Sequence, residues 1–209
     1  MIRSDVDLPP AFEWLDRQAY EPVWRRMRQR AEAVSRGKQD EVIWTCEHDP
    51  VYTTGHRGID NRRGDGLPAP LLVTDRGGET TFHGPGQLML YPVLDLRRRG
   101  LGVKQYVHLL EQSCIDLLAG KGLRATRRCG FPGVWLGDGK VAALGVRVAH
   151  GTAYHGMALN VDVDEAWFAA IRPCGLRVPT VNLASQGVYE PLSEMAAEWY
   201  HSLSDLLQG

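Results

Sequence analysis

The sequence predicts an α+β fold, a single domain in which helices flank a mixed, largely antiparallel sheet. Segments with strand character and segments with helical periodicity are interspersed without the strict alternation of a parallel βαβ fold. Residues 133–148 contain two strand-like stretches around Gly137-Asp138-Gly139, a pattern typical of an antiparallel hairpin. The chain has 209 residues and no linker-like stretch that divides it, so we expect one catalytic domain over residues 1–209.

The first half of the chain combines one helix with several strands. Residues 18–36 repeat apolar side chains at helical spacing and place Pro22 in the first turn, where proline is tolerated. Residues 55–70 contain many glycines, prolines and charges and predict a long loop. Strands are predicted at residues 41–48, 71–75 and 87–96.

The second half begins with an amphipathic helix over residues 103–119, which is expected to turn Val103, Val107, Leu110 and Cys114 inward. The hairpin follows, and then come a strand at residues 154–162 and a last helix after Pro191.

Composition excludes several classes of function. The formal net charge is −1, which gives no basic field for binding nucleic acid. No apolar run approaches the roughly 18 residues of a membrane span, so we expect no membrane association. The four cysteines show no CxxC spacing, and no signal segment opens the chain, so we expect a cytoplasmic protein.

The stretch RGGETTFHGPGQ, residues 76–87, holds four glycines and suggests a close approach of backbone to a ligand. A phosphate cradle is disfavoured because the loop has no lysine and leads into a strand rather than a helix. A metal site built on His83 and His155 lacks supporting ligand spacing, and hydrogen-bonded structural histidines are the commoner alternative. Arg76 is equally compatible with a solvated surface charge and with a side chain that fixes the loop through backbone carbonyls.

The pattern T-x-x-H-G occurs twice, at residues 80–84 and 152–156, each time beside a predicted strand. The two segments are suited to line two walls of one slot.

The cysteines differ as candidate nucleophiles. Cys46 and Cys114 fall on apolar faces and are expected to be inert core residues. Cys129 follows two arginines that would lower its thiol pKa, and Cys174 lies between a proline and a glycine that restrain its backbone. Lys140 follows the hairpin turn, where an ordinary solvated lysine is the simplest interpretation. These patterns alone leave the choice open.

Four blocks of the sequence together resemble the lipoyl(octanoyl) transferases. They are DRGGETTFHGPGQLMLYPVLDL, FPGVWLGDGKVAALGVRV, YHGMALNVD and IRPCGL, which run from about residue 73 to 175 in the order and spacing of that family. The resemblance implies the α+β fold shared by biotin and lipoate protein ligases.

The resemblance assigns the acyl-accepting cysteine to Cys174 and its partner lysine to Lys140, and it leaves Cys129 without a role. Ala143 departs from many relatives, which carry a serine there, so no hydroxyl donor is expected at this position. The implied substrate-lining residues are Arg76, Gly77, Gly78, Glu79, Thr80, Thr81, Phe82, His83, Ala143, Leu144, Gly145, Gly156, Met157 and Ala158.

The implied reaction moves an octanoyl (or lipoyl) group from acyl carrier protein to a lysine ε-amine of a lipoyl domain, the first step of endogenous protein lipoylation in lipoate biosynthesis. The implied acceptors are the lipoyl domains of 2-oxoacid dehydrogenase E2 subunits and the glycine cleavage H protein. A Cys174 thioester carries the acyl group, and neither a cofactor nor a metal is required. The alternatives are an ATP-dependent lipoate or biotin ligase of the same fold and a catalytically inactive domain that only binds acylated carriers.

Overall fold

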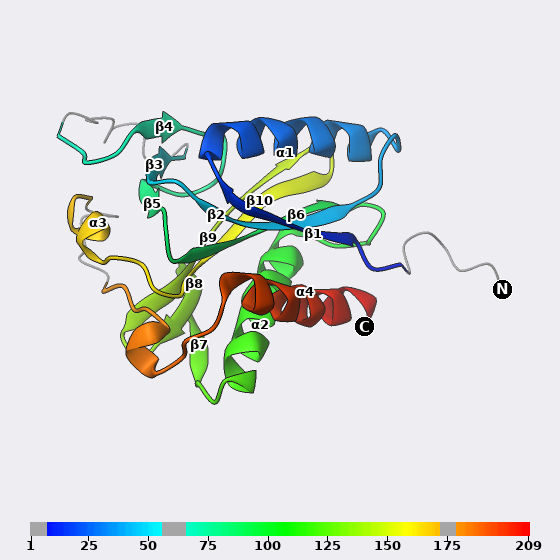
Figure 1. The fold of residues 1–209 in the computed structure, drawn as a ribbon. Coiled ribbons are helices and arrows are strands. Elements are labelled where there is room, and N and C mark those ends of the chain that lie inside the picture. Colours follow the sequence, from blue (N-terminus) through cyan, green and yellow to red (C-terminus); the bar gives the residue numbers. More distant parts are fainter. Residues whose placement is uncertain (1–7, 56–65, 172–178) are drawn as a thin grey trace.

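The strands form one seven-stranded and one three-stranded sheet in this computed structural model, which describes residues 8–55, 66–171 and 179–209 (Figure 1). In sheet order the larger sheet contains β1 (Ala11–Gln18), β2 (Val42–His48), β6 (Gln87–Asp95), β10 (Thr152–Asn160), β9 (Gly139–Ala149), β8 (Phe131–Leu136) and β7 (Ala125–Arg128). β1 pairs with β2 in parallel, and the other neighbouring strands of this sheet pair antiparallel. The predicted mixed, largely antiparallel sheet is therefore confirmed.

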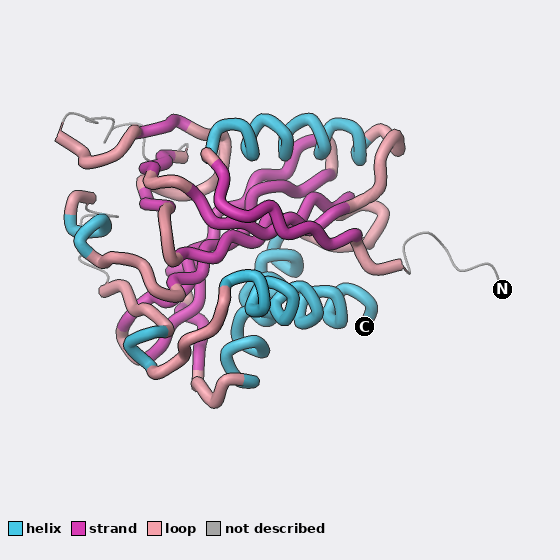
Figure 2. The backbone as a smooth tube through the Cα atoms, in the orientation of Figure 1, coloured by secondary structure: helices cyan, strands magenta, loops and turns pink. Residues whose placement is uncertain are grey.

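Helices cover both faces of the larger sheet. α1 (Tyr20–Ser35) lies on one face, and α2 (Val103–Gly120) and α4 (Leu192–Gln208) lie on the other, as Figures 1 and 2 show. α1 buries Val23, Met27, Ala31 and Val34, which recur at helical spacing and form one apolar stripe. Because both faces are covered, β6 and β10 are buried along their whole length.

The smaller sheet lies at one end of the larger one. It contains, in sheet order, β4 (Leu71–Val73), β3 (Val51–Thr54) and β5 (Thr81–His83), and Phe82 packs there against Tyr52. The short helix α3 (Ala166–Ala169) adds Trp167 to this small core, and a 3₁₀ turn follows later at Ala184–Gln186. Residues 74–80, called the glycine-rich loop from here on, join β4 to β5, so the small sheet fixes both ends of this loop.

The structure adds elements that the sequence patterns do not predict. β1 is largely exposed and polar, and its register shifts between Trp14 and Arg17, which breaks the alternation that identifies a strand. β3, β5 and β7 have three or four residues each and are too short to show a period. The expectation for Val103 is wrong, because this first residue of α2 is 50% exposed.

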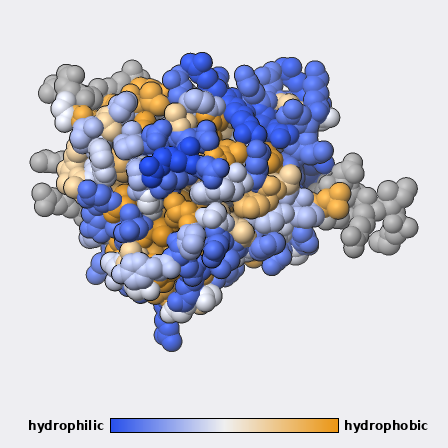
Figure 3. All heavy atoms as spheres, in the orientation of Figure 1, coloured by the Kyte–Doolittle hydropathy of each residue, from blue (hydrophilic) through white to orange (hydrophobic). Residues whose placement is uncertain are grey.

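Hydrophilic side chains dominate the outer surface over α1, whereas hydrophobic atoms gather below it toward the middle of the view in Figure 3. Among the described residues, no helix is long and apolar enough to cross a membrane.

Candidate active site

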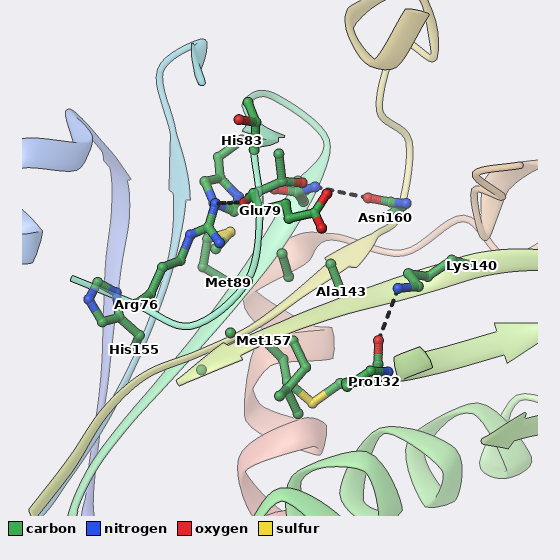
Figure 4. A pocket seen from close by; sticks show the side chains of 18 of the residues that line it. Arg76, Glu79, His83, Met89, Pro132, Lys140, Ala143, His155, Met157 and Asn160 are labelled. Carbon is green, nitrogen blue, oxygen red and sulfur yellow. Dashed lines mark hydrogen bonds between the residues drawn. The ribbon is translucent and has the colours of Figure 1, made fainter. Parts of the chain in front are cut away.

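A cavity of about 530 Å³ opens where the glycine-rich loop lies over β9 and β10 (Figure 4). Of the predicted lining residues, Gly77 and Phe82 do not face it. Gly77 instead donates its backbone N–H to the Val146 carbonyl at 3.0 Å, and the Phe82 ring stacks on Trp167 with centroids 4.8 Å apart. The predicted residues found in the cavity wall are Arg76, Gly78, Glu79, Thr80, Thr81, His83, Ala143, Leu144, Gly145, Gly156, Met157 and Ala158. Their contact with an acyl group remains a prediction.

Small residues line the part of the cavity formed by β9 and β10. Ala143 pairs with Ala158, and Gly145 pairs with Gly156, so two small pairs lie side by side along the two strands. A side chain on Gly145 would meet the Gly77 carbonyl oxygen at 2.8 Å. The glycine therefore allows the loop to lie directly on the sheet.

Arg76 fixes the glycine-rich loop from inside. The residue is 7% exposed, and its guanidinium donates to the carbonyl oxygens of Thr53 (2.7 Å), Glu79 (2.8 Å) and Gly77 (3.0 Å). Of the two interpretations left open by the sequence, the structure shows the loop-fixing one. Burial lowers the Arg76 pKa from its usual value. The three carbonyl oxygens accept hydrogen bonds from the guanidinium and so stabilise its charged form.

Asp75 joins the start of the same loop to α1 and β10. Its carboxylate accepts hydrogen bonds from His155 Nε2 (2.9 Å), from Trp24 Nε1 (2.8 Å) and from the Tyr154 hydroxyl. His155 has a φ of 59°, which is rare for a residue other than glycine and turns its ring to stack on that of Tyr154. Hydrogen bonds from His155 and Tyr154 hold the Asp75 pKa below its usual range despite partial burial.

His83 on β5 and His155 on β10 are hydrogen-bonded within the protein. His83 Nδ1 lies 2.8 Å from Gln87 Oε1, and the amide of Gln87 donates to Asn160 Oδ1 at 2.9 Å. Burial lowers the His83 pKa well below 6.5, so the ring is neutral near pH 7. His83 and His155 do line the same cavity, as the repeated T-x-x-H-G pattern suggests, but the contacts described are those of structural histidines.

Lys140 lies near the other side of the cavity, with Ala143 between it and Arg76 (Figure 4). Its Nζ donates to the Pro132 carbonyl at 2.9 Å and lies 5.0 Å from the centre of the Trp135 ring. Its backbone N–H donates to the Pro179 carbonyl at 2.8 Å, and its carbonyl accepts from Val181 at 3.1 Å. Lys140 is therefore held by both neighbouring segments and is not a solvated turn lysine.

Cys174 lies outside the described residues. The nearest described cavity residues in sequence are Ile171 and Thr180, three residues before it and six after it.

The other cysteines behave as the sequence suggests. Cys46 and Cys114 are fully buried, and burial raises the pKa of both thiols, which keeps them protonated. Cys129 is an exposed free cysteine and does not line the cavity.

Several wall residues escaped sequence reasoning, among them Tyr20, Tyr91 and Glu111. Tyr91 lies in an apolar run and resembles a core residue in the sequence, whereas Tyr20 follows polar residues at the start of α1 and carries no such signal. Glu111 carried a usable signal, because it follows Val107 by four residues and so places a carboxylate on the apolar stripe of α2.

Comparison with protein families gives one match over most of the chain. The model for the lipoyl protein ligase A/B catalytic domain matches residues 19–197. Among curated proteins, an octanoyltransferase from Thiobacillus denitrificans is 49% identical over 83% of this chain and 79% of its own. An octanoyltransferase from Aromatoleum aromaticum is 46% identical over 90% of this chain and 81% of its own.

Solved structures share the fold at low sequence identity. A lipoate-protein ligase A bound with ATP has a TM-score of 0.70 at 16% identity, over 96% of this chain and 86% of that one. A biotin protein ligase from Aquifex aeolicus has a TM-score of 0.56 at 12% identity, over 96% and 70%. These likenesses confirm the predicted fold class.

Proposed function

Since the chain belongs to the lipoyl protein ligase A/B catalytic domain family and its curated relatives are octanoyltransferases, we propose that it transfers an octanoyl group to a lysine of lipoyl domains. The enzyme is an acyltransferase. Its proposed donor is octanoyl-acyl carrier protein. A lipoyl group is the alternative acyl group that it would transfer. The proposed acceptors are the lipoyl domains of 2-oxoacid dehydrogenase E2 subunits and the glycine cleavage H protein.

The observation that carries this proposal is the position of Lys140. Its backbone is hydrogen-bonded to Pro179 and Val181, in the segment that follows Cys174, while its side chain lines the cavity. Ile171, just before Cys174 in sequence, lines the same cavity. Ile171 and Thr180, the described cavity residues on either side of Cys174 in sequence, line the cavity that also contains Lys140, which supports a role for Cys174 there.

The first step forms an acyl-enzyme. The Cys174 thiolate attacks the carbonyl carbon of the donor thioester, and a new carbon–sulfur bond forms. The bond to the pantetheine sulfur of the carrier breaks, and this sulfur takes a proton from the Lys140 ammonium, which becomes neutral. A free cysteine with a pKa near 8.5 is only a few per cent ionised at pH 7, and a neighbouring ammonium increases that fraction. Lys140 supplies this positive charge.

The second step releases the product. The lysine amine of the lipoyl domain attacks the Cys174 thioester, the carbon–nitrogen bond forms, and the Cys174 thiolate leaves. The attacking amine loses a proton, which Lys140 accepts in its neutral form as a general base. Because the thioester is already activated, amide formation requires neither ATP nor a cofactor.

The acyl chain lies in the cavity beside the small residues of β9 and β10, under the glycine-rich loop. Ala143 and Ala158 leave room for methylene groups, and Leu144 and Met157 supply apolar surface. We propose that the protein is cytoplasmic, because its four cysteines show no paired spacing of the kind found in disulfide-bonded secreted proteins.

Two donors separate this function from its alternatives. A purified lipoyl domain is incubated with the enzyme and either octanoyl-acyl carrier protein without ATP, or octanoate with ATP and Mg²⁺. We expect a mass increase of one octanoyl group only with the carrier thioester. Modification only with octanoate and ATP would indicate a ligase, and no modification with either donor would indicate a binding domain.

A further inference from the structure

One peptide unit connects a buried carboxylate to Lys140. The carbonyl oxygen of Pro132 accepts a hydrogen bond from Lys140 Nζ at 2.9 Å. The N–H of the same peptide, on Gly133, donates to Glu111 Oε1 at 2.9 Å. The N–H of the Pro132–Gly133 peptide is thus bonded to a side chain of α2, and its carbonyl is bonded to the proposed catalytic ammonium. Figure 4 shows the second of these hydrogen bonds as a dashed line.

The backbone of this peptide adopts a conformation that requires glycine. Gly133 has a φ of 119°, which residues with a side chain rarely adopt. A Cβ at this position would approach the Ala142 carbonyl oxygen to 2.4 Å and Lys140 Cδ to 3.4 Å. The register between β8 and β9 shifts next to it, between Val134 and Trp135. The ladder is irregular here, and the Gly133 N–H is bonded to a side chain outside the sheet.

Glu111 supplies that contact from α2. Its side chain is buried and lines the cavity, and Oε2 forms an ion pair with Arg127 Nε at 3.2 Å. A buried carboxylate costs free energy unless its oxygens are engaged, and here one oxygen binds Arg127 and the other binds the peptide N–H. The position of the carboxylate is therefore fixed on both sides.

We propose that Glu111 is a positioning residue for Lys140 and acts through the Pro132–Gly133 peptide. By accepting the Gly133 N–H, Glu111 directs the Pro132 carbonyl toward Nζ and fixes where the ammonium lies in the cavity. The Trp135 ring supports the same ammonium from a second side. This inference rests on the proposed role of Lys140 in acyl transfer.

Two substitutions separate the hydrogen bond from the charge. Glu111→Gln removes the charge but keeps an oxygen that accepts the Gly133 N–H. Glu111→Asp keeps the charge but withdraws the carboxylate by one bond length, roughly 1.5 Å. If Glu111 acts through the hydrogen bond, the glutamine variant retains most of the activity and the aspartate variant loses it.

The measurement is single-turnover octanoyl transfer to a lipoyl domain, with thermal unfolding of each variant to show that it is folded. We expect Glu111→Asp to slow transfer at saturating donor by about 10-fold or more, since displacement of a catalytic group by ~1 Å can cost up to ~100-fold. We expect Glu111→Gln to be slowed by no more than about threefold, and the KM for the donor to be unchanged in both. The exposed Asp205→Asn on α4 is the control and should match the unchanged protein.

A double-mutant comparison tests the connection with Lys140. In a Lys140→Ala background, the effect of Glu111→Asp should vanish, because the group that Glu111 positions is absent. An equal effect of Glu111→Asp in both backgrounds, or a glutamine variant as slow as the aspartate variant, would overturn the inference. Failure of the proposed function is distinct from this, because the unchanged protein would then show no octanoyl transfer from the carrier thioester.

Discussion

Lys140 and Pro179 are joined by a backbone hydrogen bond of 2.8 Å, which attaches the segment after Cys174 to the strand that carries the lysine. Thr180 forms a parallel bridge to Lys140, and Val181 donates to its carbonyl. The contact therefore joins β9, which carries Lys140, to described residues that follow Cys174, although Cys174 lies 34 positions after Lys140 in the sequence.

The proposed role of Lys140 predicts a large loss of rate when its amine is removed. Lys140→Ala is expected to slow octanoyl transfer by about 10²- to 10⁴-fold, because the variant lacks both the general base and the charge that favours the thiolate. The rate is measured in single-turnover reactions with octanoyl-acyl carrier protein. Lys38→Ala, which removes an exposed lysine, serves as the control. A Lys140→Ala variant as fast as that control would contradict the role.

The contact between the glycine-rich loop and β9 predicts that Gly145→Ala displaces the loop. The new Cβ would meet the Gly77 carbonyl oxygen at 2.8 Å and Arg76 Cδ at 3.3 Å, so the backbone of the loop must move. We expect a higher KM for the octanoyl donor and a lower melting temperature. Gly120→Ala at the end of α2 meets nothing within 4 Å, so it should leave the KM unchanged and should not lower the melting temperature, because alanine favours a helix. Equal behaviour of the two variants would show that the loop position does not depend on Gly145.

The small residue Ala143 in the cavity wall predicts that a larger side chain there changes the preference for acyl chain length. Ala143→Leu places a larger side chain beside Ala158 and shortens the space available to the acyl chain. We expect kcat/KM for octanoyl donors to decrease at least ~10-fold relative to butanoyl donors, since each excluded methylene forfeits about 0.8 kcal/mol of burial. The ratio of kcat/KM values for the two donors is the measurement. An unchanged ratio would mean that the acyl chain does not pass over Ala143.

The buried histidines predict that stability decreases in mild acid. Burial lowers the His48 pKa to about 4, whereas the unfolded chain has the ordinary value of 6.5. The unfolded state therefore binds a proton first as the pH falls, so stability is complete above pH 6.5 and decreases between pH 6.5 and about 4. His48 alone accounts for about 3 kcal/mol over this range, and the pKa values of His83 and His155 are lowered in the same direction.

Urea unfolding between pH 7.5 and 4.5 measures this dependence. His48→Gln removes one titrating group, so its free energy of unfolding should change less with pH than that of the unchanged protein. His201→Gln, at an exposed position of α4, is the matched control. An identical pH dependence in the His48→Gln variant would contradict the assignment.

The helices could be predicted because their apolar side chains recur at helical spacing over many residues, as in α1. The structure places α1 and the strand β10 within two residues of the predicted bounds. β1 could not be predicted in the same way, because its bulge and its exposure remove the alternation, and the parallel pairing with β2 is a tertiary contact. The hairpin of β8 and β9 was predicted from its turn glycines, but not the irregular register beside Gly133.

The site was predictable where it follows local motifs and not where it depends on contacts between distant elements. The glycine-rich loop could be named from its composition, whereas the direction of the Arg76 side chain depends on Thr53 in another strand. No local motif in the sequence marks Asp75, because the side chains that donate hydrogen bonds to it lie 51 to 80 residues away in sequence. For the same reason, only the folded chain shows that Glu111 and Lys140 are hydrogen-bonded to the same peptide group, Pro132–Gly133.

The central claim is that Cys174 carries the octanoyl group, and intact-mass measurement tests it most directly. The enzyme is mixed with octanoyl-acyl carrier protein without an acceptor, and the protein mass is recorded over time. We predict one octanoyl adduct on the unchanged enzyme, slow formation in Lys140→Ala, and no adduct in Cys174→Ser, with Cys129→Ser as the control that still forms it. An adduct that persists in Cys174→Ser would contradict the account.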